Sequence, residues 1–150
     1  MTPETINAIM VKLDVAEHQA LFIVLANDGL VNRLGTGAVN NTENDLFIGR
    51  TDDPLFAQLQ AKVRPEWMDH FGSYDVPSKA GSACKLSVLF KAAEGEEGGV
   101  SFVYGSESQG PPGDICQFVT EAVRLTEPWY EKQKQMAANP KKGKPWWRPW

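Results

Sequence analysis

Cys116 is the residue of this sequence best placed to act as a nucleophile. It follows the glycine-rich loop GSESQGPPG, residues 105–113, in the first turn of a helix predicted to start at Asp114. A helix N-terminus can cradle an anion and can lower a thiol pKa. However, Glu107 and Asp114 bring negative charge there, and the loop has no lysine and matches neither standard phosphate-binding pattern. We therefore expect a strand-to-helix connection, with Cys116 and Cys84 as small core residues.

Other combinations of reactive residue types are weaker still. Glu66 and His70 are spaced to share one helix face and Asp69 lies beside them, but two ligands do not make a metal site. A surface ion pair between Glu66 and His70 is the better interpretation. His18 has no potential co-ligand near it in sequence, and no serine stands in a GxSxG motif. We predict no catalytic residue, no metal and no cofactor.

The last eleven residues, 140–150, read PKKGKPWWRPW and form the least ordinary segment of the chain. Trp146, Trp147 and Trp150 would expose a large apolar area if nothing covered them, and Arg148 stands among them. The segment could fold onto its own domain, pack on a partner subunit, bind another protein or lie at a membrane interface. We expect it to dock onto its own domain or a neighbouring subunit, held by tryptophan burial.

Charge is distributed unevenly along the 150 residues. Residues 1–139 hold all 19 acidic residues and 11 of the 15 basic ones, a net charge of −8, whereas residues 140–150 carry +4. An acidic body repels nucleic acid, so we expect no nucleic-acid partner. No apolar run is long enough to span a membrane, and the N-terminus lacks the features of a secretory signal. We therefore expect a cytoplasmic protein with reduced thiols and no membrane partner.

The elements around Cys116 have clear patterns. Apolar residues alternate with polar ones in two stretches, 84–91 and 100–104, and the sequence GEEGG between them allows the chain to reverse. These stretches predict a β-hairpin. From Asp114 to about Ala138, apolar residues recur at helical spacing, which predicts one long helix kinked at Pro128.

The N-terminal half contains a similar set of elements. Ile6, Ile9, Met10 and Leu13 fall at i, i+3, i+4 and i+7, which predicts a helix over 3–13. The remaining predicted elements are a strand buried on both faces (20–26), a tight turn (27–29), a less buried partner strand (30–35), an edge strand (46–48), a helix (55–63), a short helix (66–71) and a loop (72–82).

Together these elements predict an α+β fold. We expect an antiparallel sheet of four or five strands in the order α-β-β-(β)-α-β-β-α, with the helices mainly on one face and a single domain over residues 1–139. This order of elements resembles that of class I type III secretion chaperones and of roadblock-type dimerisation modules. The resemblance covers element order alone and no shared motif.

The function that fits these features best is that of a non-enzymatic protein-binding domain. We expect an adaptor, a chaperone-like or an immunity-like protein that binds another protein or forms a homodimer. The candidate binding residues are Trp146, Trp147, Arg148, Trp150, Tyr104 and Cys116. The alternative is a small-molecule binder or enzyme whose pocket lies between the 105–114 loop, Tyr104 and Cys116.

Overall fold

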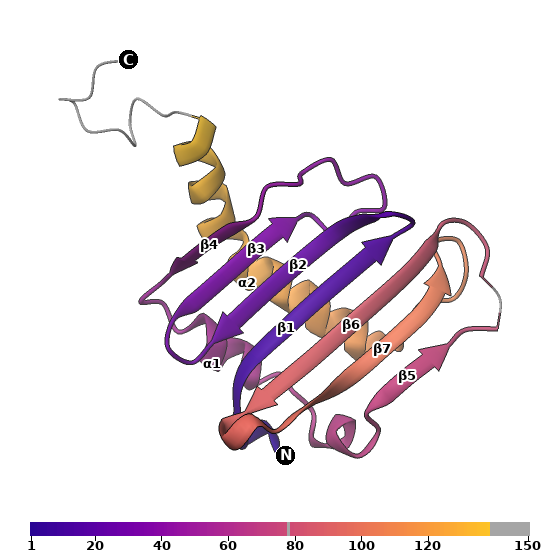
Figure 1. Ribbon diagram of the computed structural model, residues 1–150, viewed down its shortest axis with the longest axis horizontal. Helices are drawn as coiled ribbons and strands as arrows, with labels where there is room; N and C mark the ends of the chain where they lie inside the picture. The colour runs from indigo at the N-terminus through magenta and orange to yellow at the C-terminus, as the bar shows by residue number, and fades with distance from the viewer. Residues whose placement is uncertain (78, 139–150) are drawn as a thin grey trace.

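One large sheet with helices on one of its faces makes up the described part of the chain (Figure 1). The computed structural model describes residues 1–77 and 79–138. Within them the sheet has seven strands in the order β4-β3-β2-β1-β6-β7-β5. The elements are η1 (Pro3–Thr5), β1 (Ile6–Val15), β2 (His18–Ala26), β3 (Leu30–Gly35), β4 (Phe47–Arg50), α1 (Leu55–Gln60), η2 (Pro65–Asp69), β5 (Gly72–Asp75), β6 (Ala83–Ala92), η3 (Ala93–Gly95), β7 (Glu97–Gly105) and α2 (Gly113–Ala138), where η marks a 3-10 helix.

The two halves of the chain join at the middle of the sheet. Strands β1 to β4 form an antiparallel meander, and β6 and β7 form the predicted hairpin. β1 pairs antiparallel with β6, which makes these two strands the junction between the meander and the hairpin. β5 then adds to the outer edge of β7 in a parallel orientation.

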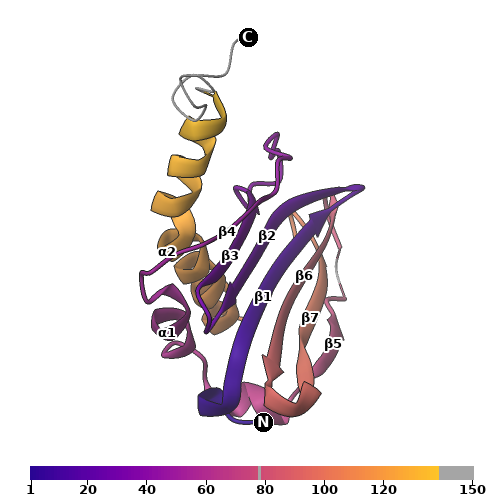
Figure 2. The same ribbon diagram turned by 60° about the vertical axis from the view of Figure 1, so that its left-hand side comes forward.

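The helices α1 and α2 lie on the same face of the sheet, as Figures 1 and 2 show. α2 places Phe118, which is almost fully buried, edge-on to Trp67 and to Phe90 of β6, with ring centroids 5.2 and 6.3 Å apart. The apolar stripe of α2 therefore packs against Phe90 of the sheet. None of the helices in the described part of the chain is long and apolar enough to cross a membrane.

The predicted helix over residues 3–13 is wrong. Only Pro3–Thr5 is helical there, and β1 occupies Ile6–Val15. Ile9, Val11, Leu13 and Val15 alternate toward the helices, and all four are buried. The pairing of β1 with β6 slips by one residue between Ile6 and Ala8, so Ile6 is also buried although it lies three positions before Ile9. A bulge of this kind imitates helical spacing.

The sheet is also larger than predicted. It has seven strands rather than four or five, because the predicted N-terminal helix is a strand and residues 72–75, predicted as loop, form β5. Apart from the three-residue η1, the element order begins with strands and not with a helix, so the resemblance in element order fails at the N-terminus. The predicted edge strand is confirmed as β4, shifted by one to two residues.

β2 is not buried on both faces, because Phe22, Val24 and Ala26 are only half-buried.

The second half of α2 is fastened to β3 by a buried arginine. The strand over residues 30–35 was predicted to be less buried than its neighbour, but the side chain of Arg33 within it is fully enclosed. Its guanidinium donates to the carbonyl oxygen of Gly35 at 3.0 Å, to Thr126 Oγ1 at 3.0 Å and to Glu127 Oε2 at 3.0 Å, and it lies 4.3 Å from the centre of the Tyr130 ring. α2 runs on through Pro128, as predicted.

Candidate functional site

Two of the candidate binding residues, Tyr104 and Cys116, lie where β7 leads into α2. Tyr104 pairs with Cys84 across the β6–β7 ladder and is half-buried. Cys84 is buried as predicted, but Cys116 is exposed on the first turns of α2, so its assignment to the core was wrong. Both thiols lie close enough for their thiolate charges to act on the Tyr104 hydroxyl. The other four candidates, Trp146, Trp147, Arg148 and Trp150, lie outside the described residues.

The local environment keeps the Tyr104 hydroxyl and the thiols of Cys84 and Cys116 protonated near neutral pH. Burial, with a smaller effect of the two thiols, raises the pKa of Tyr104 to about 12. Burial also raises the pKa of Cys84. Partial burial of its sulfur, and then the neighbouring Asp114 carboxylate, raise the pKa of Cys116 above its ordinary value. A thiolate nucleophile would need a shift in the opposite direction.

A cavity of about 670 Å³ does adjoin Cys116, but it opens between the segment after α1 and the first turns of α2. Lys62, Arg64 and Glu121 line it together with Cys116, and Tyr104 does not. The structure thus places Cys116 beside a cavity without bringing Tyr104 into it.

Glu66 pairs with Arg64 at 3.8 Å, not with His70 as the sequence suggested. Within residues 1–77 and 79–138, no group of three or more acidic, histidine or cysteine side chains is arranged to hold a metal ion.

The raised pKa of Cys116 and the burial of Cys84 can be tested by thiol labelling. In the native protein, we expect Cys116 to react with a thiol reagent at pH 7.5 more slowly than free glutathione, with a rate that climbs through pH 9 and beyond, because its pKa is raised. Cys84 is buried and should react only after unfolding. The measurement is a mass-spectrometric labelling time course over a pH series. Fast, complete labelling of Cys116 at neutral pH would contradict the description.

The face of the sheet opposite the helices is uncovered by any described element, and it faces the viewer in Figure 1. Strand registers place one row of residues across this open face, from β7 to β4. The row runs Gly99, Leu89, Met10, Val24, Asn32 and Ile48. Leu89 is 38% exposed and Ile48 is 64% exposed, which is unusual for apolar side chains in the middle of a strand.

Comparison with protein-family models, with curated proteins and with solved structures finds no match for the chain.

The part of this row from Gly99 to Val24 is hollowed. A depression of about 390 Å³ lies there over β7, β6, β1 and β2, with Met10, Val24 and Leu89 among its lining residues. Gly99 shapes it, because a side chain there would collide with the carbonyl oxygen of Val88 and with Leu89. Lys91 and Glu97, 3.9 Å apart, stand at its edge. The open face therefore offers an apolar concavity with polar borders.

One polar atom in the row has no partner. The Asn32 side-chain oxygen is enclosed and accepts no hydrogen bond from the described residues. It lies between Val24 of β2 and Ile48 of β4. A buried acceptor of this kind is costly unless a donor reaches it.

The open face was not predicted from the sequence, although the sequence contains one signal for it. The run ALFIVLA at 20–26 is apolar at every position, which predicted a strand covered on both sides. The structure covers one side with helices and leaves Phe22 and Val24 half-exposed on the other. The apolar side chains of this strand that the helices do not cover are therefore left partly open to solvent.

Proposed function

We propose that this chain is a non-enzymatic protein-binding domain that forms a homodimer through the open face of its sheet. The observation that carries the proposal is the row from Gly99 to Ile48, which crosses six strands and exposes Leu89 and Ile48 to solvent. A sheet face of this kind is stabilised when a second apolar surface removes it from water. A two-fold axis would set the same row of one copy against that of the other.

Charge favours a second copy as the partner. Residues 1–139 carry a net charge of −8, so most surfaces of two copies repel each other. On the open face, positive and negative side chains are instead paired, in Lys12–Asp14 at 3.6 Å and Lys91–Glu97 at 3.9 Å. Two copies of a face with this internal balance can approach without facing like charges.

The rival function, catalysis or small-molecule binding beside Cys116, has less support. It would draw on the cavity of about 670 Å³, but the raised pKa of Cys116 leaves the nucleophile protonated. Tyr104, its proposed companion, also has a raised pKa, of about 12, and does not line that cavity. The groups on which this rival function would rely are therefore mostly protonated near neutral pH.

The dimer is tested by placing a charge in the row. Leu89→Lys puts an ammonium group where the proposed interface buries a leucine, and an unpaired buried charge is costly. We expect the wild-type chain to sediment as a dimer and Leu89→Lys to weaken association by at least about tenfold. Sedimentation velocity over a concentration series measures both. Because Leu89 is already partly exposed in one copy, its replacement should leave the melting temperature nearly unchanged.

Val39→Lys is the matched control. Val39 is 46% exposed but lies in the loop between β3 and β4, away from the row. We expect this variant to dimerise like the wild type. A wild-type chain that stays monomeric over the whole concentration series would rule out the proposal, as would an unchanged dimer in Leu89→Lys.

A further inference from the structure

Asn32 lies among apolar side chains on the open face and lacks a hydrogen-bond donor. Among residues 1–77 and 79–138, its Oδ1 is the only enclosed side-chain oxygen or nitrogen without a hydrogen bond. Strand alternation and register surround it with apolar neighbours, which are Leu30 and Leu34 on β3, Val24 on β2 and Ile48 on β4. None of these side chains can donate a hydrogen bond. The donor that satisfies Asn32 therefore has to come from outside this set of neighbours.

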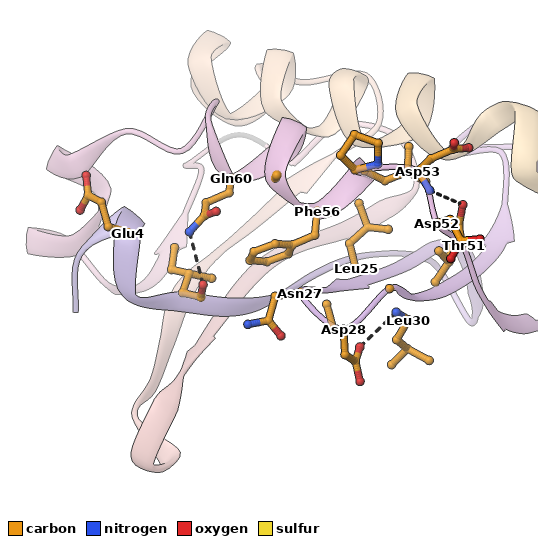
Figure 3. Close-up of a pocket in the computed structure, with 17 residues that line it drawn as sticks. Glu4, Leu25, Asn27, Asp28, Leu30, Thr51, Asp52, Asp53, Phe56 and Gln60 are labelled. Carbon is orange, nitrogen blue, oxygen red and sulfur yellow. Dashed lines mark hydrogen bonds between the residues drawn. The ribbon is translucent and has the colours of Figure 1, made fainter.

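Polar groups on the helix side of the sheet are better satisfied. A cavity beside α1, of about 620 Å³, opens there between α1, the β2–β3 turn and the loop after β4 (Figure 3). Leu25 and Phe56 on its floor are already buried by the chain itself. The side chains of Asp28 and Gln60, drawn in Figure 3, both make hydrogen bonds within the chain. The unsatisfied acceptor thus belongs to the face that no described element covers.

A second asparagine has the right chemistry and length to satisfy Asn32. An amide group supplies both a donor and an acceptor, so two copies of one asparagine can satisfy each other. Facing sheets pack about 10 Å apart, and two extended asparagine side chains joined by one hydrogen bond of about 2.9 Å span a similar distance. The terminal torsion of asparagine is broad, so the amide can turn its oxygen toward the facing sheet.

The strand order indicates how a two-fold axis would run. An axis along the row, from Gly99 to Ile48, sets six strands of one copy against six of the other and leaves Asn32 facing Asn32. An axis through Asn32 along β3 would overlap only β2, β3 and β4, and Leu89 would have no partner. The axis along the row removes more apolar surface from water and is therefore favoured.

The rows on either side agree with this axis. The rotation sets the residue two positions before a row member against the residue two positions after it in the second copy. Phe22 then faces Ala26, large against small, and Leu30 faces Leu34. The charged side chains of these rows all lie directly opposite uncharged ones: Lys12 faces Ala8, Lys91 faces Ser87, Glu97 faces Ser101 and Arg50 faces Leu46. Direct repulsion between like charges is thus avoided.

We infer that Asn32 lies on the two-fold axis of the homodimer, where its amide group hydrogen-bonds to that of Asn32 in the second copy and fixes the register of the two sheets. The inference rests on the proposed dimer and names the residue that aligns its two copies. A single asparagine buried in the apolar seam of a coiled coil specifies register in the same way, at some cost in stability.

Mixing two forms of the chain tests whether Asn32 faces itself. Asn32→Leu puts an apolar side chain of the same branching into an apolar surrounding, so the chain should still fold, which its melting temperature checks. Substitutions away from the axis act additively, so an equilibrated equimolar mixture with the wild type would hold about half heterodimers. On the axis, an Asn–Leu pair leaves the amide unpaired, and we expect fewer than about one quarter heterodimers. Native mass spectrometry with isotope-labelled wild type counts them.

Asn32→Asp should shift the mixture in the opposite direction. Two facing carboxylates repel each other, whereas one carboxylate facing an amide accepts its hydrogen bond, so heterodimers with the wild type should exceed about three quarters. Val39→Asp places the same charge in the loop between β3 and β4 and should give about half heterodimers. About half heterodimers in the Asn32→Leu mixture would overturn the inference, whatever the Asn32→Asp mixture gives, because the effects would then be additive.

The two proposals fail separately. A wild-type chain that stays monomeric overturns the open-face dimer itself. If the wild type dimerises and Leu89→Lys dissociates it, while the Asn32→Leu mixture holds about half heterodimers, the dimer stands and the pairing of Asn32 alone is wrong.

Discussion

Phe118→Ala is expected to lower the free energy of unfolding by about 3–5 kcal/mol, because it removes a buried ring and leaves a cavity. Phe118 is 2% exposed and packs edge-on against Trp67 and Phe90, so the helix and the sheet both lose contacts. The gap cannot close easily, since Trp67 is itself fixed by a 2.9 Å hydrogen bond from its indole N–H to Asp114. A urea titration followed by circular dichroism gives the value.

The neighbouring Gln117 supplies the control for Phe118. Gln117 is exposed on the same turn of α2, and alanine is a good helix former, so Gln117→Ala should change stability little. A loss below about 1 kcal/mol for Phe118→Ala would mean that this stripe of α2 is not core, since Phe→Ala in a core costs several times more.

Replacing Arg33 with methionine is expected to cost about 2–4 kcal/mol. The carbonyl oxygen of Gly35 would lose a donor, at about 1–3 kcal/mol for a buried acceptor, whereas that of Val123 would keep the Thr126 hydroxyl as a donor. The cation above the Tyr130 ring is lost as well. Methionine fills much of the space and removes the cost of burying a charge, which offsets part of these losses.

Two further substitutions separate the charge of Arg33 from its shape. Arg33→Lys keeps the charge but cannot reach Gly35, Thr126 and Glu127 together, so we expect it to be destabilised nearly as much as the methionine variant. Arg124→Met removes an exposed arginine from α2 and should have little effect. Thermal unfolding of the three variants makes the comparison. A stable Arg33→Lys would show that charge alone holds α2 to β3.

The sequence correctly predicted the elements whose apolar residues recur with a spacing that fits either a strand or a helix, but not both. The β6–β7 hairpin and α2 were found because their periods of two and 3.6 are uninterrupted. β1 was taken for a helix because the bulge beside Ile6 produces a three-residue spacing that competes with the alternation from Ile9 to Val15. β5 was missed because all four of its residues are exposed, and it pairs only because β7 offers a free edge.

The candidate sites were less predictable, since they depend on contacts between distant residues. Nothing around Arg33 indicates burial, because Thr126, Glu127 and Tyr130 lie more than 90 positions later. The cavity beside α1 likewise combines Glu4, the 27–29 turn and the 51–54 segment. The row on the open face depends on strand register, which side-chain alternation alone does not fix.

The central β1–β6 pair governs the order in which the chain can fold. Ile6 meets Ala92 and Val15 meets Cys84, so the innermost ladder joins segments far apart in sequence. During synthesis, the β1–β4 meander emerges early but keeps one edge of β1 unpaired until β6 has been made. Pairing β1 with β6 closes a long loop, and the entropy cost of closing it precedes the stabilising contacts, so this step is slow. Until it is complete, the unpaired edge of β1 can pair with strands of other chains. Folding of this protein is therefore expected to be limited by the arrival of its C-terminal half.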